Sequence, residues 1–157
     1  MVTLYNVISE DGYIARKDGS EDFIPDSYWP HTLNVLKKYD RILIGRKTYD
    51  AIQTYDDKER KQFDELPIEK FVVTRDKNFK PKSGYKVVNT PEEAIEPDIN
   101  IVVTSGPTLN NYLLQRKLVQ KVTYHKVSES IGEGIKPYEN VPDTIYTKEL
   151  LIAEKIS

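Results

Sequence analysis

The amino-acid sequence predicts an α/β fold with a largely parallel sheet. Short apolar segments rich in β-branched residues recur along the chain, as at 2–9, 41–44 and 70–74, and such segments are typical of strands buried on both faces. Segments with helical signals separate them, and this alternation is the pattern of parallel α/β proteins. No internal repeat or long linker divides the 157 residues, so we expect a single domain spanning 1–157.

The remaining elements are expected from the same signals. Further strands are expected at 85–89, 100–104 and 120–128, and one or two within 143–157. Helices are expected at about 30–39, at 48–52, at 90–96 and after Pro107. The polar segment 54–66 has no clear assignment. Because apolar and polar residues alternate in 120–128 and strand-forming residues dominate the C-terminus, we expect an antiparallel edge there.

Composition excludes several classes of site. The chain has no cysteine, which excludes thiol nucleophiles, disulfides and cysteine-based zinc sites. Its two histidines, His31 and His125, lack the spacing of a zinc-binding pair, so no metal site is expected. The net charge is −2 with the signs interleaved, which predicts neither a nucleic-acid nor a membrane partner. With no membrane-spanning run and no signal segment, we expect a cytoplasmic protein.

Three of the predicted strands end in polar turns that suit a ligand with phosphate groups. These turns are Gly45-Arg46-Lys47-Thr48, then Thr74-Arg75, and then Ser105-Gly106-Pro107-Thr108-Leu109. The carboxyl ends of parallel strands share one edge of the sheet, and the N-terminus of a helix attracts anions. Because Arg46, Lys47 and Arg75 add positive charge, the three turns predict a site for a dinucleotide-sized anion. The sequence contains neither the Gly-x-Gly-x-x-Gly fingerprint nor a P-loop motif.

Four segments of the sequence are informative because of the order in which they occur. Residues 9–15 read Ser-Glu-Asp-Gly-Tyr-Ile-Ala, 44–49 read Ile-Gly-Arg-Lys-Thr-Tyr, 105–109 read Ser-Gly-Pro-Thr-Leu, and 113–137 place Leu-Leu and Leu-Val before Ile-Gly-Glu-Gly. Together they resemble the dihydrofolate reductase-like family, and most closely its group containing the C-terminal reductase domain of riboflavin biosynthesis. The resemblance covers nearly the whole chain. It implies a three-layer fold with a mixed, mostly parallel sheet of about eight strands, flanking helices and an antiparallel C-terminal edge.

The resemblance further implies an NADPH-dependent reductase that acts on a small molecule and forms a homodimer through its C-terminal strands. The nicotinamide carboxamide would meet backbone groups of Val7 and Ile14. The phosphates would contact the turn Gly45-Arg46-Lys47-Thr48, and the pyrophosphate would lie on Ser105-Gly106-Pro107-Thr108-Leu109. Thr74 and Arg75 would lie near the adenosine 2′-phosphate. Ser105-Gly106 stands where the family has two glycines.

The reaction implied is hydride transfer to a C=N bond, which also needs a proton at the nitrogen. Asp26 is nearest in position to the family's carboxylate, with Asp22 in reserve, although Asp26 is also explained as a residue that caps the helix with Ser27. Trp29 and His125 are candidate substrate contacts, and both are also explained as packing residues.

The substrate class stays open between a pterin-like ring and a ribosylaminopyrimidine. The Pro-Trp pair of dihydrofolate reductases is missing, which disfavours folate. A phosphosugar would need cations near the substrate, and Arg16 and Lys17 are the ones that the first loop offers. Two alternatives remain beside the reductase: a nucleotide-binding module of the same fold without catalysis, and a flavodoxin-like domain.

Overall fold

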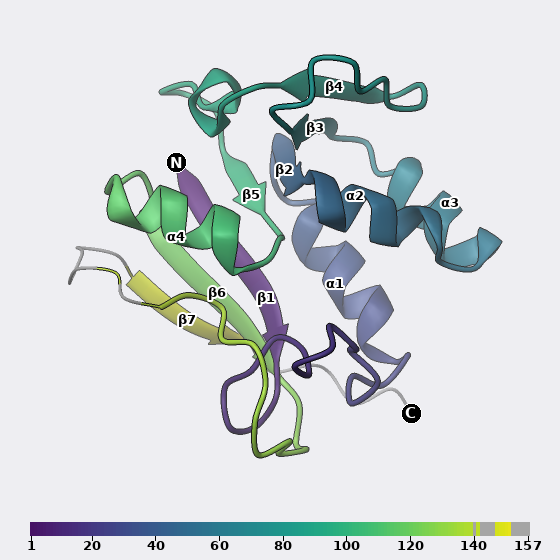
Figure 1. Cartoon of the computed structure of the whole chain (residues 1–157), viewed down its shortest axis with the longest axis vertical. Helices are drawn as coiled ribbons and strands as arrows, with labels where there is room; N and C mark the ends of the chain where they lie inside the picture. Colours follow the sequence, from purple (N-terminus) through teal and green to yellow (C-terminus); the bar gives the residue numbers. More distant parts are fainter. Residues whose placement is uncertain (140, 142–146, 152–157) are drawn as a thin grey trace.

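The computed structural model describes residues 1–139, 141 and 147–151 (Figure 1). The strands are β1 (Val2–Ile8), β2 (Arg41–Gly45), β3 (Glu69–Val73), β4 (Tyr85–Val88), β5 (Ile101–Val103), β6 (Lys121–Lys126) and β7 (Thr147–Leu151). The helices are α1 (Tyr28–Leu36), α2 (Arg46–Gln53), α3 (Asp57–Asp64), the single 3₁₀ turn η1 (Pro91–Ala94) and α4 (Pro107–Gln115).

The strands form one sheet in the order β4-β3-β2-β5-β1-β6-β7, and every neighbouring pair is parallel. The predicted α/β class with a mostly parallel sheet is therefore confirmed. The described residues contain seven strands rather than about eight.

The antiparallel C-terminal edge is wrong for β6 and β7, because β7 runs parallel to β6, with Val122 beside Lys148. The chain leaves the carboxyl end of β6 and returns to the start of that strand before β7 begins, where the N–H of Thr147 donates to the carbonyl of Gln120. The alternation of residue types in 120–128 does not report the direction of β6, nor does it match burial, since Val122, Thr123 and His125 are all buried. Residues 143–146 and 152–157 of the predicted terminal strands lie outside the described residues.

Helices cover both faces of the sheet. On one face, side chains of α1, α2 and α3 such as Leu36, Ile52 and Phe63 pack with Ile42 and Ile44 of β2. On the other face, Leu109, Leu113 and Leu114 of α4 pack with Leu43 and with Leu4 of β1. Successive residues of β2 therefore enter opposite cores, as the period of two in a strand requires. The three layers match the predicted architecture.

The segment 54–66, which has no clear assignment in the sequence, contains helix α3. The carboxylate of Asp56 caps this helix by accepting the N–H of Glu59 at 2.8 Å. Phe63 is its one buried side chain, so the apolar stripe that normally announces a helix is almost missing. The helix expected at about 30–39 begins earlier, at Tyr28, and ends at Leu36. The helix expected at 90–96 is only the 3₁₀ turn η1.

The short central strand β5 creates a notch in the sheet. Its last residue, Val103, lies beside Leu4 of β1 and Leu43 of β2. Strand β1 continues to Ile8 and β2 to Gly45, so both neighbours extend past the end of β5. The turn that follows β5 enters helix α4 at this place, between the carboxyl ends of β1 and β2. Ligands of open α/β sheets bind at such positions.

Candidate functional site

A cleft of about 620 Å³ opens over this notch. It is lined by parts of β1, the loop after β1, helices α1, α2 and α3 with the turn between the last two, the turn after β5, and Ile135. A cavity of this size is typical of small-molecule sites. Of the predicted site residues, those that line it are Val7, Ile14, Asp26, Trp29, Lys47, Thr48, Ser105, Gly106 and Pro107.

Ser105 joins two of the three predicted ligand turns. Its Oγ accepts the N–H of Gly45 at 3.2 Å and lies 3.2 Å from Oγ1 of Thr48. A Cβ on Gly45 would itself lie 3.2 Å from this Oγ, a tight contact that a glycine avoids. The carbonyl of Ser105 accepts the side-chain amide of Asn6 at 2.9 Å. The start of α2, the turn after β5 and strand β1 are therefore fixed relative to one another.

Two helix N-termini meet at this corner without side-chain caps. Gly45 and Gly106 are the N-cap residues of α2 and α4, and neither can cap with a side chain. Pro107 opens α4, so the free N–H groups of its first turn belong to Thr108 and Leu109. Leu109 packs its side chain in the core while Thr108 is exposed. Lys47 lines the cleft and has no ion pair among the described residues. This corner is electropositive and suits an anion.

Arg46 and the turn after β3 lie beside the cleft rather than in its lining. Arg46 pairs with Asp50 at 3.1 Å and with Asp76 at 3.5 Å, and its guanidinium lies 3.9 Å from the ring centre of Phe79. Its contact with Asp76 connects the start of α2 to the turn that carries Thr74 and Arg75. The Oγ1 of Thr74 accepts the N–H of Asp76 at 3.1 Å, and Arg75 is exposed.

Val7 presents free backbone groups to the notch. The carbonyls of Val2 and Ile8 accept N–H groups from the β6 side, and the carbonyl of Met1 accepts one from β5. Because alternate residues of a strand direct their backbone groups to opposite sides, the N–H and carbonyl of Val7 point toward β5. Since β5 ends beside Leu4, no strand of the described part of the chain pairs with Val7 on that side. The N–H of Ile14, in contrast, donates to the carbonyl of Ile135 at 2.8 Å.

The first loop is tied to the turn 131–135, so two segments of the family resemblance meet in space. The carboxylate of Asp11 accepts the N–H groups of Ile131 and Gly132 at 3.1 and 2.8 Å. Ala15 and Ile135 form an antiparallel bridge. A Cβ on Gly134 would lie 2.4 Å from the carbonyl oxygen of Ala15, so glycine is required at this close approach.

The two candidate acids are placed differently. Asp26 lines the cleft at the start of α1. Its backbone carbonyl accepts the N–H of Trp29, and the N-cap residue Ser27 makes no side-chain cap. Asp22 lies outside the lining and pairs with Arg16, and this hydrogen bond lowers the pKa of the Asp22 carboxyl. A carboxylate held ionised in this way is a poor proton donor.

Trp29 belongs to an aromatic wall of the cleft. Its ring meets Tyr55 edge to face at 5.7 Å between centres and stacks with Phe63 at 6.4 Å. The indole N–H donates to the side chain of Gln62 at 3.0 Å, which fixes the ring plane. Trp29 is therefore both a packing residue and a cleft-lining one.

Two carboxyl groups of the cleft, Glu21 and Glu59, are absent from the sequence-based prediction. Desolvation raises the pKa of both, and the charges of Asp56 and Asp26 raise that of Glu59 further. Glu21 lines the cleft although the residue as a whole is exposed. Burial, with the charges of Glu21 and Glu59, raises the pKa of Tyr55 to about 12. Both glutamates lie in polar, mixed-charge segments that carry no motif.

His125 does not line the cleft, but it contacts Tyr5, which does. It is buried, and its Nδ1 lies 2.6 Å from the hydroxyl of Tyr5, a cleft residue that the sequence analysis does not single out. The same hydroxyl lies 3.2 Å from Oγ1 of Thr32. Burial lowers the pKa of His125 and raises that of Tyr5 to about 12. Both groups are therefore neutral at neutral pH.

No protein-family model matches the chain, and no curated protein matches it. Solved structures do match it, among them the following two. A protein from Shewanella sp. PV-4 assigned to riboflavin biosynthesis matches with 18% identity over 91% of this chain and 85% of its own, at a TM-score of 0.67. The diaminohydroxyphosphoribosylaminopyrimidine deaminase/5-amino-6-(5-phosphoribosylamino)uracil reductase of Thermotoga maritima matches with 19% identity over 91% of this chain and 49% of its own, at 0.64.

The chain therefore spans about half the length of the Thermotoga protein. At these identities the likeness shows the fold, which is the one that the sequence resemblance predicts. Within the described ranges, no helix is long and apolar enough to cross a membrane. The same residues hold no group of three or more histidine or acidic side chains arranged for a metal ion.

Proposed function

We propose that the cleft binds NADPH and that the protein is a reductase that delivers a hydride to a C=N bond of a pterin-like or ribosylaminopyrimidine ring. The observation that carries the proposal is the corner around Ser105, where two uncapped helix N-termini and the unpaired Lys47 meet over the notch. Phosphate groups are the anions that such corners bind best. The shared fold with proteins of riboflavin biosynthesis supports the choice of cofactor and reaction.

Each part of the cofactor has residues that suit it. Lys47, Thr48 and the first-turn N–H groups of α4 would hold the pyrophosphate. The free N–H and carbonyl of Val7 would form hydrogen bonds with the carboxamide. The carboxamide would take the place that a neighbouring strand has beside other residues of β1. The adenosine 2′-phosphate would lie between Arg46 and Arg75, on the turn that Asp76 connects to α2. When bound, NADPH supplies the hydride.

The chain itself must supply the proton that the ring nitrogen takes up. Asp26 lines the cleft and its side chain has no partner among the described residues. Glu21 lines the same cleft, and desolvation raises the pKa of its carboxyl. We assign Asp26 as the group that orients the ring and delivers the proton. Glu21 is assigned as a second group that can deliver it. Asp22, paired with Arg16, has no part in the reaction.

The proposal is tested by measuring the affinities of NADPH and NADH by calorimetric titration. We expect NADPH to bind more tightly, and Arg75→Ala to reduce this preference by about tenfold, because the 2′-phosphate loses a cation. Lys37→Ala, which removes an exposed cation at the end of α1, is the matched control and should leave the preference intact. Equal affinities of the wild-type protein for the two cofactors would contradict the assignment.

The chemistry is tested separately by following NADPH oxidation with dihydropterin and aminopyrimidine substrates. Turnover that falls at least tenfold in Asp26→Asn supports the reductase. Tight NADPH binding without turnover would instead favour the module without catalysis. The homodimer and the cytoplasmic location remain proposals, and light scattering would test the first.

A further inference from the structure

The cleft has a charged mouth and an uncharged polar floor. Asp26, at the start of α1, lines the cleft and is exposed, which places it at the mouth. Tyr5 of β1 also lines the cleft, but only 1% of this residue is exposed, which places it at the floor. Its hydroxyl lies 3.2 Å from Oγ1 of Thr32, a third lining residue, on α1. A ligand group that reaches the floor therefore meets two hydroxyl groups.

Tyr5 lies beside the place that the proposed function gives to the nicotinamide. Tyr5 and Val7 are two residues apart in β1, so their side chains leave the same face of the sheet. Both pack in the core that α1, α2 and α3 cover. Residues two apart in a strand have Cα atoms about 6.5 Å apart. A substrate ring beside a nicotinamide at Val7 is therefore within reach of the Tyr5 hydroxyl.

A buried histidine holds this hydroxyl from the side away from the cleft. Nδ1 of His125 lies 2.6 Å from the hydroxyl of Tyr5. The rings of Tyr28 and His31 pack around the imidazole, with ring centres 6.2 and 6.0 Å from its own. Burial lowers the pKa of His125, and the charges of His31 and Lys38 lower it further. The imidazole is therefore neutral at neutral pH.

The neutral imidazole determines the direction of the hydrogen bond. An imidazole nitrogen is a stronger base than a phenol oxygen, and a phenol is a stronger acid than a neutral imidazole. The Tyr5 hydroxyl therefore donates its one proton to Nδ1 of His125, and only its oxygen lone pairs remain for Thr32 and for a group in the cleft. A charged ligand group would be buried here without an opposite charge, which is costly. The floor thus suits a neutral donor.

We propose that Tyr5 is a specificity-determining residue whose phenol oxygen accepts a hydrogen bond from a neutral N–H or hydroxyl group of the substrate, and that His125 is a positioning residue that acts through Tyr5. This inference rests on the proposed function and deepens it, because it assigns the substrate contact at the floor of the cleft. A carbonyl oxygen at this place would face the lone pairs of the phenol oxygen and is disfavoured. His125 takes part in binding although it does not line the cleft.

The direction of the hydrogen bond is tested first, without a substrate. The chain has two histidines, so NMR of protein labelled with ¹⁵N-histidine resolves both, and the spectrum of His125→Asn identifies the signals of His125. At neutral pH we expect an unprotonated Nδ1 and a protonated Nε2 on His125. A protonated Nδ1 would overturn the inference, because the Tyr5 hydroxyl would then be free to donate to the ligand.

The substrate contact is tested by calorimetric titration of protein saturated with NADP⁺. The probes are dihydropterin and 5-amino-6-(5-phosphoribosylamino)uracil, the compound in the name of the Thermotoga protein. We expect Tyr5→Phe to weaken the binding of the tighter probe by about tenfold, because a buried donor loses its acceptor. Tyr85→Phe is the matched control and should keep the wild-type affinity, since Tyr85 is a buried strand residue whose hydroxyl donates to Asp64 outside the cleft.

The positioning role of His125 is tested by combining variants. His125→Leu should weaken binding at least about threefold. The double variant Tyr5→Phe/His125→Leu should bind as weakly as Tyr5→Phe alone, because His125 acts only through the Tyr5 hydroxyl. In His125→Asn an amide oxygen can accept in place of Nδ1, so the affinity should return to within about twofold of wild type. Tyr5→Phe and His125→Asn decide the outcome if His125→Leu does not fold.

Three results of the titrations would overturn the inference. They are wild-type affinity in Tyr5→Phe, additive losses in the double variant, and no binding of either probe to the wild-type protein. Failure of the proposed function gives a different result, because then the wild-type protein binds no NADPH in a separate titration.

Discussion

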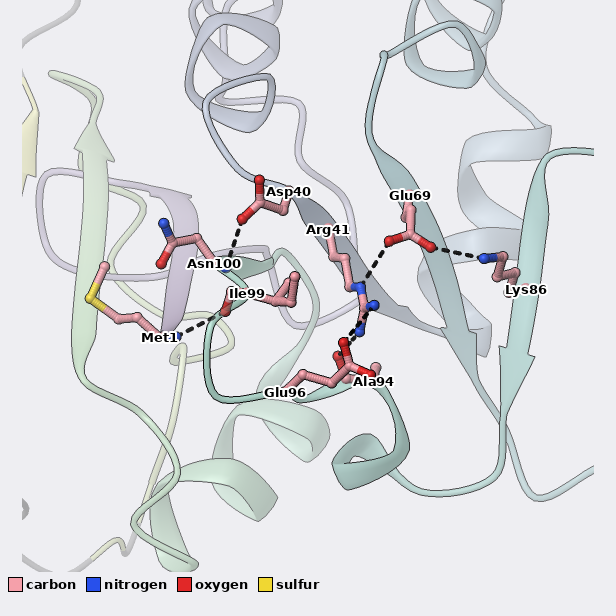
Figure 2. Close-up of polar contacts among 9 residues, drawn as sticks. All are labelled: Met1, Asp40, Arg41, Glu69, Lys86, Ala94, Glu96, Ile99 and Asn100. Carbon is pink, nitrogen blue, oxygen red and sulfur yellow. Dashed lines mark hydrogen bonds and ion pairs between the residues drawn. The ribbon is translucent and has the colours of Figure 1, made fainter.

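The two edges of the sheet use their polar groups in opposite ways. At the edge where the strands begin, charged side chains pair with one another and with backbone groups (Figure 2). At the edge where they end, two helix N-termini lack side-chain caps and Lys47 has no ion pair among the described residues. Paired groups stabilise the fold, and unpaired groups at a cleft are free to bind. The polar groups where the strands begin therefore hold the fold together, and those where the strands end are available to a ligand.

Arg41 is the centre of the paired edge. Its guanidinium donates to Glu69 at 3.0 Å, to Glu96 at 2.9 Å and to the carbonyl of Ala94 at 3.1 Å, and only 12% of the side chain is exposed. Glu69 also pairs with Lys86 (Figure 2). These contacts connect β2, β3, β4 and the segment that precedes β5. The starts of these three strands are thereby connected to one another.

The largest expected effect comes from breaking this edge. Arg41→Ala removes three hydrogen bonds and leaves Glu69 without its buried partner, so we expect a loss of about 2 to 3 kcal/mol in the free energy of unfolding. Lys86→Ala, which removes only the exposed partner of Glu69, should cost less than about 1 kcal/mol. Urea unfolding measures both. Equal losses would show that Arg41 is not the centre of the edge.

The next effect concerns the two glycines beside the cleft. In Gly134→Ala the new methyl would meet the carbonyl oxygen of Ala15, so the first loop must shift, at a cost of about 2 kcal/mol. Gly106→Ala meets no atom within 4 Å and should cost less than about 1 kcal/mol, the usual difference between glycine and alanine at an N-cap. Thermal unfolding without ligand compares them. Similar losses in both variants would contradict the close approach at Gly134.

The smallest stability effect appears at alkaline pH. Burial raises the pKa of Tyr5 to about 12 from its usual value of 10.0. Between these values the native state keeps a proton that the unfolded chain loses, so stability falls as pH rises from about 10 to about 12. Tyr5→Phe should reduce this slope by about 1 kcal/mol per pH unit. Urea unfolding at several alkaline pH values gives the slope, and unchanged slopes would contradict the burial of this hydroxyl.

The sequence predicts the strands well because their apolar, β-branched residues are buried on both faces, as in β1 and β2. It also brings Gly45 and Ser105 to one corner of the sheet, because each follows a predicted strand and the carboxyl ends of parallel strands share an edge. It misses α3, because a helix with a single buried residue has no apolar stripe in its sequence. It also misses the direction of β7, which depends on the long connection from β6 and not on the pattern of apolar residues within the strand.

The acidic part of the cleft shows the other limit of sequence reasoning. Glu21 and Glu59 come from a loop and a helix that are far apart in the chain, and the fold brings both to the lining of one cleft. Arg46 shows a related limit, since its motif does not reveal that its side chain also pairs with Asp50 and Asp76 beside the cleft. Motifs identify candidate residues, and tertiary contacts decide which of them face the ligand.

The two edges of the sheet are compared most directly by the increase in Tm that NADPH causes in the wild-type protein, in Arg41→Ala and in Lys47→Ala. A ligand that binds only the native state raises its stability. Arg41→Ala should lower the Tm without ligand and keep the wild-type increase. Lys47→Ala should keep the wild-type Tm and lose most of the increase, corresponding to about tenfold weaker binding. No increase in the wild-type protein, or equal increases in wild type and Lys47→Ala, would contradict the account.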